Sequence, residues 1–355
     1  MRIIIVTDAW HPQINGVVRT LTTLKQHLAA AGHEAIAITP DQFRTIPCPT
    51  YPEIRLALFP GRRMARMIES FRPCVVHIAT EGPIGLAARN YCVKRDVPFT
   101  TAFHTKFPEY VNARSGFPVS WLYALVRWFH APSHGVMVAT DTVEAELTRW
   151  GFKNIRRWSR GVDTEQFRPR DKSLFADLPK PVSLYVGRVA VEKNIESFLA
   201  LDLPGTKVVV GEGPQLNTLT RRYPDVKFVG VKQGEDLARH FAAADVFVFP
   251  SLTDTFGLVL LEALACGVPV AAYPVAGPLD VIGSAPVGCL HENLATAVHE
   301  ALKADPAACR AHALKFSWEA SVQQFVSHIR PFRTETYFPE SDQPHEPVAD
   351  AAAAG

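Results

Sequence analysis

The chain has 355 residues, of which 47% are hydrophobic and 20% charged, a composition typical of a globular protein long enough for two domains. The formal net charge of +2 argues against a general nucleic-acid-binding protein, which would normally be more basic. The six cysteines form no C-x-x-C pair, so we expect reduced thiols in the cytoplasm rather than disulfides.

In the first half of the chain, short apolar runs alternate with helical patterns, which predicts parallel strands joined by crossover helices. The predicted strands cover residues 3–6, 35–39, 75–78, 99–101 and 136–139. The predicted helices cover residues 21–31, 84–95 and 142–150. This order of elements indicates a doubly wound α/β domain.

The same pattern starts again after a polar stretch that contains several prolines. The second set of predicted strands covers residues 182–186, 207–210, 226–229, 246–249 and 268–271, and a last helix covers 318–329. We therefore predict two Rossmann-like domains that face a central cleft, because ligands bind at the carboxyl ends of parallel strands. The predicted bounds are 1–165 and 181–315 for the domains, 166–180 for the linker, 316–332 for a C-terminal helix and 333–355 for a disordered tail.

Two strand-end loops of the second domain hold candidates for phosphate binding. Arg188 and Lys193 follow strand 182–186 where a helix begins, and two cations with backbone amides suit a diphosphate. The alternative is that both are solvated surface charges. Gly211 and Gly213 follow strand 207–210 and would let a ligand approach the backbone closely, although an ordinary turn explains them as well.

The segment after strand 246–249 leads into an apolar helix with a single charged residue, Glu262. Thr255 is a candidate N-cap, which would leave the first backbone amides of the helix open to an anion. These are the amides of Phe256, Gly257 and Leu258. A buried carboxylate needs a partner, and for Glu262 this is either a ribose diol or an ion pair with an arginine or lysine. Asp254 lies at the mouth of the helix, where it could hold sugar hydroxyls.

Two positions in the first domain are further candidates. Gly16 opens the first helix and permits close approach of a phosphate. His104 follows strand 99–101, at the edge of the sheet where ligands bind, although a lone histidine is more often a packed or surface residue.

In their order and spacing, these motifs resemble the retaining glycosyltransferases of the GT-B fold, glycosyltransferase family four. The resemblance covers residues 1 to about 330. The segments that carry it are Asn15-Gly16-Val17-Val18-Arg19, Phe103-His104-Thr105, Gly161-Val162-Asp163, Gly187-Arg188 with Glu192-Lys193-Asn194, and Gly211-Glu212-Gly213-Pro214. The family's E-x7-E pair is Asp254 and Glu262 here, so an aspartate replaces the first glutamate and shortens the arm that would touch the sugar.

The resemblance implies transfer of a sugar from a nucleotide-diphosphate sugar with the α-configuration retained. Arg188, Lys193 and the helix amides would neutralise the leaving diphosphate, so neither a metal ion nor a cofactor is expected. His104 and Asp254 would contact the sugar, and Glu262 would contact the ribose. The backbone near Val231 would contact the base of a uridine or guanosine nucleotide. A front-face substitution is expected, in which the leaving phosphate accepts the proton of the acceptor.

A narrower resemblance, carried by residues 47–51 and 117–130, is to the lipid-glycosylating branch of the family. That branch comprises sulfoquinovosyl-, glucosyl- and glucuronosyl-diacylglycerol synthases and GDP-mannose-dependent mannosyltransferases. It implies a lipid acceptor, diacylglycerol first, and a cytoplasmic enzyme bound peripherally to the anionic inner face of the membrane. Residues 59–72 fit a basic amphipathic helix with Met64, Met67, Ile68 and Phe71 on one side, and residues 121–129 mix aromatic side chains with arginine, so both segments are candidates for contact with the membrane. The alternative is that both apolar faces pack on the first sheet.

Other functions remain open at this point. The acceptor could be a soluble molecule or a polysaccharide, or the protein could be a nucleotide-sugar epimerase of the same fold, which would need acid–base groups in the cleft. A binding protein without catalysis is disfavoured by Arg188, Lys193 and Glu262. A dehydrogenase is disfavoured because the G-x-G-x-x-G fingerprint is missing.

Overall fold

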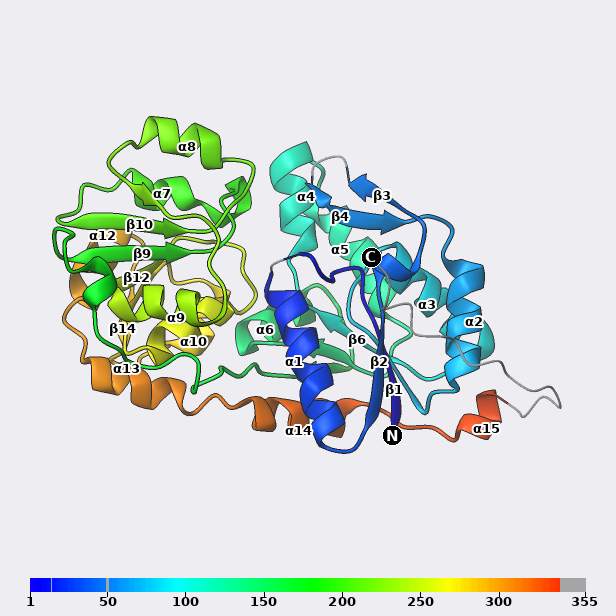
Figure 1. Ribbon diagram of the computed structural model, residues 1–355. Helices are drawn as coiled ribbons and strands as arrows, with labels where there is room; N and C mark the ends of the chain where they lie inside the picture. Colours follow the sequence, from blue (N-terminus) through cyan, green and yellow to red (C-terminus); the bar gives the residue numbers. More distant parts are fainter. Residues whose placement is uncertain (14, 49–50, 339–355) are drawn as a thin grey trace, which may run out of the picture.

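A computed structural model of the chain describes residues 1–13, 15–48 and 51–338. These residues form two α/β domains that lie side by side (Figure 1). Each domain is built around a six-stranded sheet whose paired strands are all parallel. Pro49 and Thr50, which belong to the lipid-branch resemblance, lie outside the described residues.

The first domain has the strand order β2-β1-β5-β6-β7-β8. The strands are β1 (Arg2–Val6), β2 (Glu34–Ile38), β5 (Val75–Ile78), β6 (Thr100–Phe103), β7 (Val136–Val138) and β8 (Ile155–Arg157). The helices α2 (Gly61–Phe71), α3 (Pro83–Arg95), α5 (Val119–His130) and α6 (Asp141–Arg149) cover one face, and α1 (Gly16–Ala30) covers the other. A short antiparallel ribbon, β3 (Thr45–Cys48) and β4 (Tyr51–Ala57), precedes α2, and α4 (Phe107–Ser115) follows β6.

The second domain has the strand order β11-β10-β9-β12-β13-β14. The strands are β9 (Val182–Val186), β10 (Thr206–Val210), β11 (Lys227–Phe228), β12 (Val246–Phe249), β13 (Val270–Ala272) and β14 (Gly288–Leu290). One face packs on α9 (Gly234–Ala243), α10 (Leu258–Ala265) and α13 (Pro306–Ala313), and the other on α7 (Ile195–Leu199), α8 (Leu216–Arg222) and α12 (Leu294–Ala301). The strands read as continuous apolar runs in the sequence because both faces of the sheet are covered by helices.

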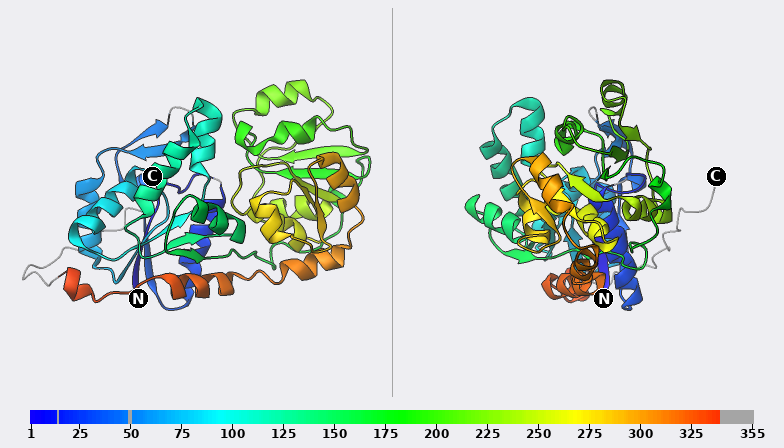
Figure 2. Two further views of the ribbon diagram at one scale, coloured as in Figure 1. Left: turned by 180° about the vertical axis from the view of Figure 1, so that it is seen from behind. Right: turned by 90° about the vertical axis from the view of Figure 1, so that its left-hand side faces the viewer.

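The end of the chain returns to the first domain. Helix α14 (Trp318–His328) crosses from the second domain and packs on α1, with Phe325 fully buried against the first core (Figures 1 and 2). The predicted disordered tail is wrong for residues 333–338. Thr334–Tyr337 form α15, and Phe338 is buried in the cluster under α2 and α3, because the Phe332 amide donates to the Cys74 carbonyl and holds this segment against the domain. Residues 339–355 of the predicted tail lie outside the described residues.

The strand order reverses beside the first strand of each sheet. β2 and β5 flank β1 in the first domain, and β10 and β12 flank β9 in the second. Crevices at such reversal points, outside the carboxyl ends of the strands, are where open α/β sheets bind ligands. The loops after β1, β9 and β12 lead to Gly16, Arg188 and Asp254, so the topology brings these three positions to the facing edges of the two sheets.

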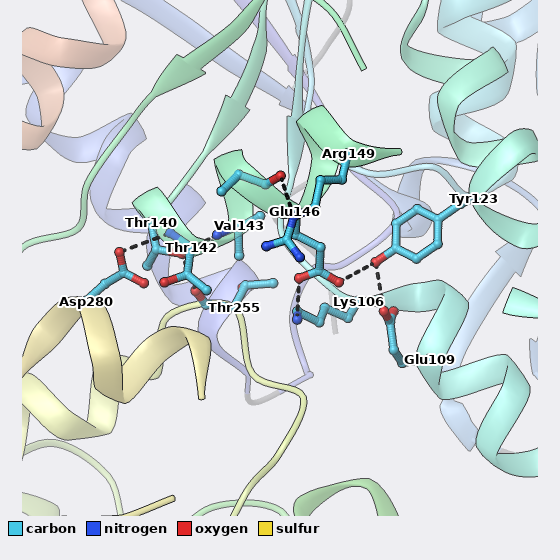
Figure 3. Close-up of polar contacts among 11 residues, drawn as sticks. Lys106, Glu109, Tyr123, Thr140, Thr142, Val143, Glu146, Arg149, Thr255 and Asp280 are labelled. Carbon is cyan, nitrogen blue, oxygen red and sulfur yellow. Dashed lines mark hydrogen bonds and ion pairs between the residues drawn. The ribbon is translucent and has the colours of Figure 1, made fainter. Parts of the chain in front are cut away.

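Hydrogen bonds between the domains hold these edges together (Figure 3). Asp280, in α11 (Ala276–Val281) of the second domain, accepts from the amides of Asp141 and Thr142 at the start of α6, at 2.8 and 3.2 Å. A carboxylate at a helix N-terminus accepts hydrogen bonds from amides that have no partner inside the helix. Its negative charge also interacts favourably with the positive end of the helix dipole. Beside it, the Thr140 hydroxyl donates to the Thr255 carbonyl at 3.3 Å. The second domain therefore caps a helix of the first.

The buried His77 of β5 makes the stability of the first domain depend on pH. Burial, and then the positive charge of Arg160, lower its pKa from 6.5 to about 3. Between these values the unfolded chain binds a proton that the folded chain does not, so stability is lost as the pH falls below 6.5. We expect the free energy of unfolding in urea to drop by about 2 kcal/mol more between about pH 7 and about pH 5 in the wild type than in His77→Gln.

The exposed His299 provides the matched control, because His299→Gln removes a histidine from the surface of α12. Its unfolding free energy should follow the wild-type pH dependence. Equal slopes for the wild type and His77→Gln would contradict the assignment of this proton to His77.

Candidate functional site

The starts of helices α1 and α10 face each other across the domain interface. A Cβ atom built on Gly16, the first residue of α1, would meet the Leu258 Cδ1 atom at 3.8 Å and nothing closer. Asn15 caps α1 by accepting from the amides of Val17 and Val18 at 3.0 Å. Because both helices direct the positive ends of their dipoles at the same space, this space favours an anion.

The start of α10 differs from the sequence prediction. Its N-cap is Gly257, with a φ of 79° in the left-handed region that favours glycine, and not Thr255. The Thr255 hydroxyl instead donates to the His104 carbonyl of the first domain at 2.6 Å. Phe256 precedes the helix and is buried in the core, so the amides that open the helix are those of Leu258 and Val259 rather than those of Phe256 and Gly257.

Glu262 lies in α10 with 3% of its surface exposed. Its Oε1 atom accepts from the Arg19 guanidinium of α1, so the ion pair that was one of the two predicted alternatives is present. Its Oε2 atom is buried and has no hydrogen-bond partner among the described residues. Burial raises the pKa of Glu262, and the charge of Arg19 opposes that rise. One carboxylate oxygen is therefore occupied and the other is left for a donor that the chain does not supply.

Lys193 and Asp254, both predicted to touch the ligand, form an ion pair with 2.5 Å between Nζ and Oδ1. Burial disfavours the charged form of Lys193, but Asp254 and the hydroxyls of Tyr110 and Tyr185 outweigh it, so the pKa of Lys193 is raised. The Oδ2 atom of Asp254 is buried without a partner within the described residues. Tyr110 belongs to α4 of the first domain, which therefore also reaches this part of the second domain.

The backbone around Arg188 is fixed by its own strand. The hydroxyl of Tyr185, a buried residue of β9, donates to the Arg188 carbonyl at 2.7 Å. Next to it, Asn194 adopts a φ of 50° and donates from its side chain to the Pro250 carbonyl at 3.1 Å. These bonds tie the loop after β9 to the loop after β12 and bring Arg188 and Lys193 to the same edge of the sheet.

The predicted glycines of the next loop are needed for contact between loops. At Gly211, with a φ of 140°, a Cβ atom would lie 1.9 Å from the Gly187 carbonyl oxygen, and at Gly213 it would lie 2.3 Å from that of Val189. The Gly211 amide also donates to the Gly230 carbonyl, next to the predicted base-binding position Val231. The close approach at Gly211 and Gly213 is thus one of backbone to backbone. A hollow of about 660 Å3 opens beside them, lined by Leu216, Asn217, Thr220, Arg221, Phe228 and Gly230.

His104 directly follows β6 with its Nε2 atom buried, and its protonation state follows from its neighbours. The Nδ1 atom lies 3.1 Å from Nη2 of Arg160, which can only donate, so Nδ1 accepts and Nε2 carries the hydrogen. Nε2 is buried without a partner among the described residues. Burial, then Arg160, His77 and His130, hold the pKa of His104 well below its ordinary value. His104 therefore presents an N–H donor rather than a base.

Three residues of the site were not assigned a role from the sequence. Arg19 lies in the segment Asn15-Gly16-Val17-Val18-Arg19, and Arg160 directly precedes the segment Gly161-Val162-Asp163. Tyr110 lies in none of the segments that carry the family resemblance. Each acts through a contact with a residue far away in the chain, so no local pattern reveals it. In the described part of the chain, no group of three or more His, Cys, Asp and Glu side chains could hold a metal ion.

Taken together, the facing helix starts, Arg188 and Lys193 offer positive charge for an anion. The unpartnered oxygens of Asp254 and Glu262 accept hydrogen bonds, and Nε2 of His104 donates one. Hydroxyl groups match both kinds of partner, so the arrangement suits a polyhydroxylated ligand that carries phosphate.

Comparison with known proteins agrees with this chemistry. The model of the family described as Glycosyltransferase Family 4 matches residues 14–166, and that described as Glycosyl transferases group 1 matches residues 180–304. A GDP-mannose-dependent alpha-mannosyltransferase of Mycobacterium tuberculosis is 29% identical over 94% of this chain and 97% of its own length. An alpha-monoglucosyldiacylglycerol synthase of Streptococcus pneumoniae is 27% identical over 94% of this chain and 85% of its own.

The fold has solved counterparts as well. Sucrose-phosphate synthase from Thermosynechococcus elongatus superimposes with a TM-score of 0.74 and 24% identity, over 92% of this chain and 97% of that protein. Both domains and their connection are therefore shared with it at the level of the fold.

The carboxylate of Glu262 is predicted to accept from the ribose of a bound nucleotide. Glu262→Gln should weaken the binding of UDP or GDP roughly ten- to a hundredfold, the effect of losing a hydrogen bond to a charged group. The measurement is isothermal titration calorimetry, with circular dichroism to show that the variant folds. Unchanged affinity in a folded variant would show that Glu262 does not bind the nucleotide.

Arg188 and Lys193 are predicted to stabilise the leaving diphosphate. Arg188→Ala and Lys193→Ala should each lower sugar-transfer turnover by roughly tens to thousands of fold, as removal of a transition-state donor does elsewhere. Lys227→Ala removes an exposed lysine of the same domain and should leave turnover unchanged. Wild-type activity in both site variants, or activity that requires Mg2+ and is abolished by a chelator, would contradict this metal-free role.

Proposed function

The chain belongs to glycosyltransferase family four and is a glycosyltransferase, and we propose that it moves a hexose from a nucleoside-diphosphate sugar to a membrane lipid with retention of configuration. The observation that carries the donor part is a combination of positive groups and open polar atoms. The positive groups are two facing helix starts, Arg188 and Lys193, and the polar atoms are three that have no partner among the described residues. The positive groups suit the diphosphate, and the atoms of Asp254, Glu262 and His104 suit sugar hydroxyls.

Transfer proceeds on one face of the sugar in this proposal. The bond from the anomeric carbon to the diphosphate oxygen breaks while the bond to the acceptor oxygen forms on the same side, and the departing phosphate takes the acceptor's proton. The helix starts, Arg188 and Lys193 stabilise the charge that builds on the diphosphate. His104 donates from Nε2 to a sugar oxygen and remains neutral throughout, since its Nδ1 atom is held by Arg160. The two domains hold donor and acceptor in reacting position.

The lipid acceptor is supported by relatives and by the surface of the first domain. A monoglucosyldiacylglycerol synthase matches almost the whole chain, and its name records a diacylglycerol acceptor. The predicted apolar side of α2 cannot bind a membrane, because Met64 and Ile68 are fully buried against the sheet and Met67 and Phe71 pack beside them. The alternative prediction, that this side packs on the first sheet, is the correct one.

The second segment predicted to contact the membrane, residues 121–129, keeps several apolar side chains exposed. Trp121, Leu125 and Trp128, here called the α5 stripe, are spaced by four and three residues and so share one exposed side of the helix, and Phe117 is exposed just before the helix begins. Trp121 is 70% exposed and Leu125 56%. Arg127 is exposed on the same helix, and the Arg89 guanidinium lies 3.9 Å from the Trp128 ring centroid. Exposed tryptophans beside arginines are typical of interfacial membrane helices. Among the described residues, no helix is long and apolar enough to cross a membrane.

We expect the wild type to co-sediment with vesicles that contain anionic lipid, less at high salt, and to glycosylate diacylglycerol in them. Trp121→Ser with Leu125→Ser should reduce co-sedimentation and lipid glycosylation by roughly tenfold or more, because each large apolar side chain contributes about 1.5–3 kcal/mol when buried. Hydrolysis of the donor alone should be unchanged in this variant, since neither residue lies in the nucleotide site.

Leu314→Ser, which removes an exposed leucine of the second domain, is the control for surface polarity. Equal binding to neutral and anionic vesicles, together with full activity on a water-soluble sugar acceptor, would show that the acceptor is not a membrane lipid. Incubation with the donor alone distinguishes the epimerase alternative, because an epimerase would change the sugar without any acceptor.

A further inference from the structure

Arg19 lies near the N-terminus of α1, where a positive charge is unfavourable unless a negative charge compensates it. It lies in the first turn of α1, where the helix dipole is positive, and its amide donates to the Asn15 carbonyl. Its guanidinium leaves α1, crosses the domain interface and donates to Oε1 of Glu262. Its Cζ atom lies 5.1 Å from the ring centroid of Phe167, a fully buried residue of the core cluster of the second domain. The guanidinium thus has two contacts with residues outside α1, an ion pair and a ring.

Glu262 depends on this contact. An ionised carboxylate buried in an apolar helix is costly without a counter-charge, and two other arginines close to the C-terminal end of α10 are engaged elsewhere. Arg310 donates to the carbonyls of Phe167 and Ala265, and Arg170 pairs with Glu235. Burial raises the pKa of Glu262, and the positive charge of Arg19 opposes this. Arg19 thereby favours the ionised form, which accepts stronger hydrogen bonds than the neutral acid does.

The two carboxylate oxygens of Glu262 differ in their hydrogen bonding. Oε1 is engaged by Arg19, while Oε2 is buried and unpartnered among the described residues. A bond to Oε1 fixes the plane of the carboxylate and so the direction in which Oε2 points. The first domain therefore orients an acceptor atom that belongs to the second domain.

We propose that Arg19 is a positioning residue for the nucleotide, which holds Glu262 through Oε1 so that Oε2 accepts from a ribose hydroxyl. The proposal rests on the donor part of the proposed function. It makes recognition of the ribose a property of both domains together, because the carboxylate comes from one domain and the group that orients it comes from the other. A nucleotide then gains its ribose contact only when the domains are apposed, which links ribose binding to their closure.

A purely structural role for Arg19 makes a different prediction. If the ion pair only joins the domains, its loss lowers stability and weakens every ligand by the same factor. If it positions Oε2, its loss weakens nucleotides that carry ribose hydroxyls and leaves those that lack them unaffected. The ratio between the two affinities, called here the ribose factor, separates these roles.

The experiment measures dissociation constants of UDP and GDP and of their 2′,3′-dideoxy analogues by calorimetry. In the wild type we expect the nucleotide that binds to do so roughly ten- to a hundredfold more tightly than its dideoxy analogue. In Arg19→Met the ribose factor should fall to near one, while the dideoxy analogue binds as to the wild type. Arg19→Lys, which keeps the charge, should restore part of the ribose factor. The double variant Arg19→Met/Glu262→Gln should lose no more than either single variant, because both act on one contact.

Lys25→Met, which removes an exposed cation from the same helix, serves as the matched control and should keep the wild-type ribose factor. A wild-type ribose factor in Arg19→Met, or an equal loss for both nucleotides, would overturn the role of Arg19 and leave the proposed function standing. Failure of the wild type to bind UDP, GDP or either analogue would instead overturn the proposed donor site, and the role of Arg19 with it. Thermal unfolding of each variant shows that the comparison is made between folded proteins.

Discussion

Glu262 is a carboxylate with 3% exposure in a helix that has no other charge, and its need for a partner constrains both domains. No residue of α10 can supply that partner, so it comes from Arg19 at the start of α1. This contact requires the starts of α1 and α10 to face each other, which they do at Gly16 and Leu258. The same apposition creates the space that favours a phosphate. One buried charge thus sets the geometry in which the other groups act.

The other ligand-facing groups of the site, charged or neutral, are also held by partners. Lys193 is paired with Asp254, and His104 accepts from Arg160, so each group that would touch the ligand is held by a neighbour. In each case one polar atom of the ligand-facing residue has no partner in the part of the chain that the structure describes, namely Oδ2 of Asp254, Nε2 of His104 and Oε2 of Glu262. Buried polar atoms without partners are rare in native proteins. These three belong to residues that also contact the opposite domain or pair with a predicted ligand residue, which is why they point to a ligand.

Sequence patterns predicted the elements well where periodicity is strong and failed where the outcome depends on distant contacts. The two parallel sheets follow from alternating apolar runs and helices, and most strand ends were placed within about two residues. The prediction that Thr255 is the N-cap of α10 is wrong, because the Thr255 hydroxyl donates to the His104 carbonyl of the other domain. The apolar side of α2 faces the sheet, which an amphipathic pattern alone cannot distinguish from a membrane. The site motifs marked Glu262, but its partner lies 243 residues away and no spacing reveals it.

The pair of Lys193 and Asp254 has a consequence for the order of events at the donor site. A diphosphate carries more negative charge than one carboxylate, so it competes with Asp254 for the ammonium of Lys193. Once the ammonium turns to the phosphate, Asp254 loses its counter-charge in a buried place and must find other donors. Sugar hydroxyls are such donors, and they arrive attached to the same phosphate. In the proposed donor site, the contact between Asp254 and the sugar is therefore expected to form after, and because of, the contact between Lys193 and the diphosphate. An aspartate at this position, with its short side chain, can serve both partners only if they lie close together, as the anomeric carbon and its phosphate do.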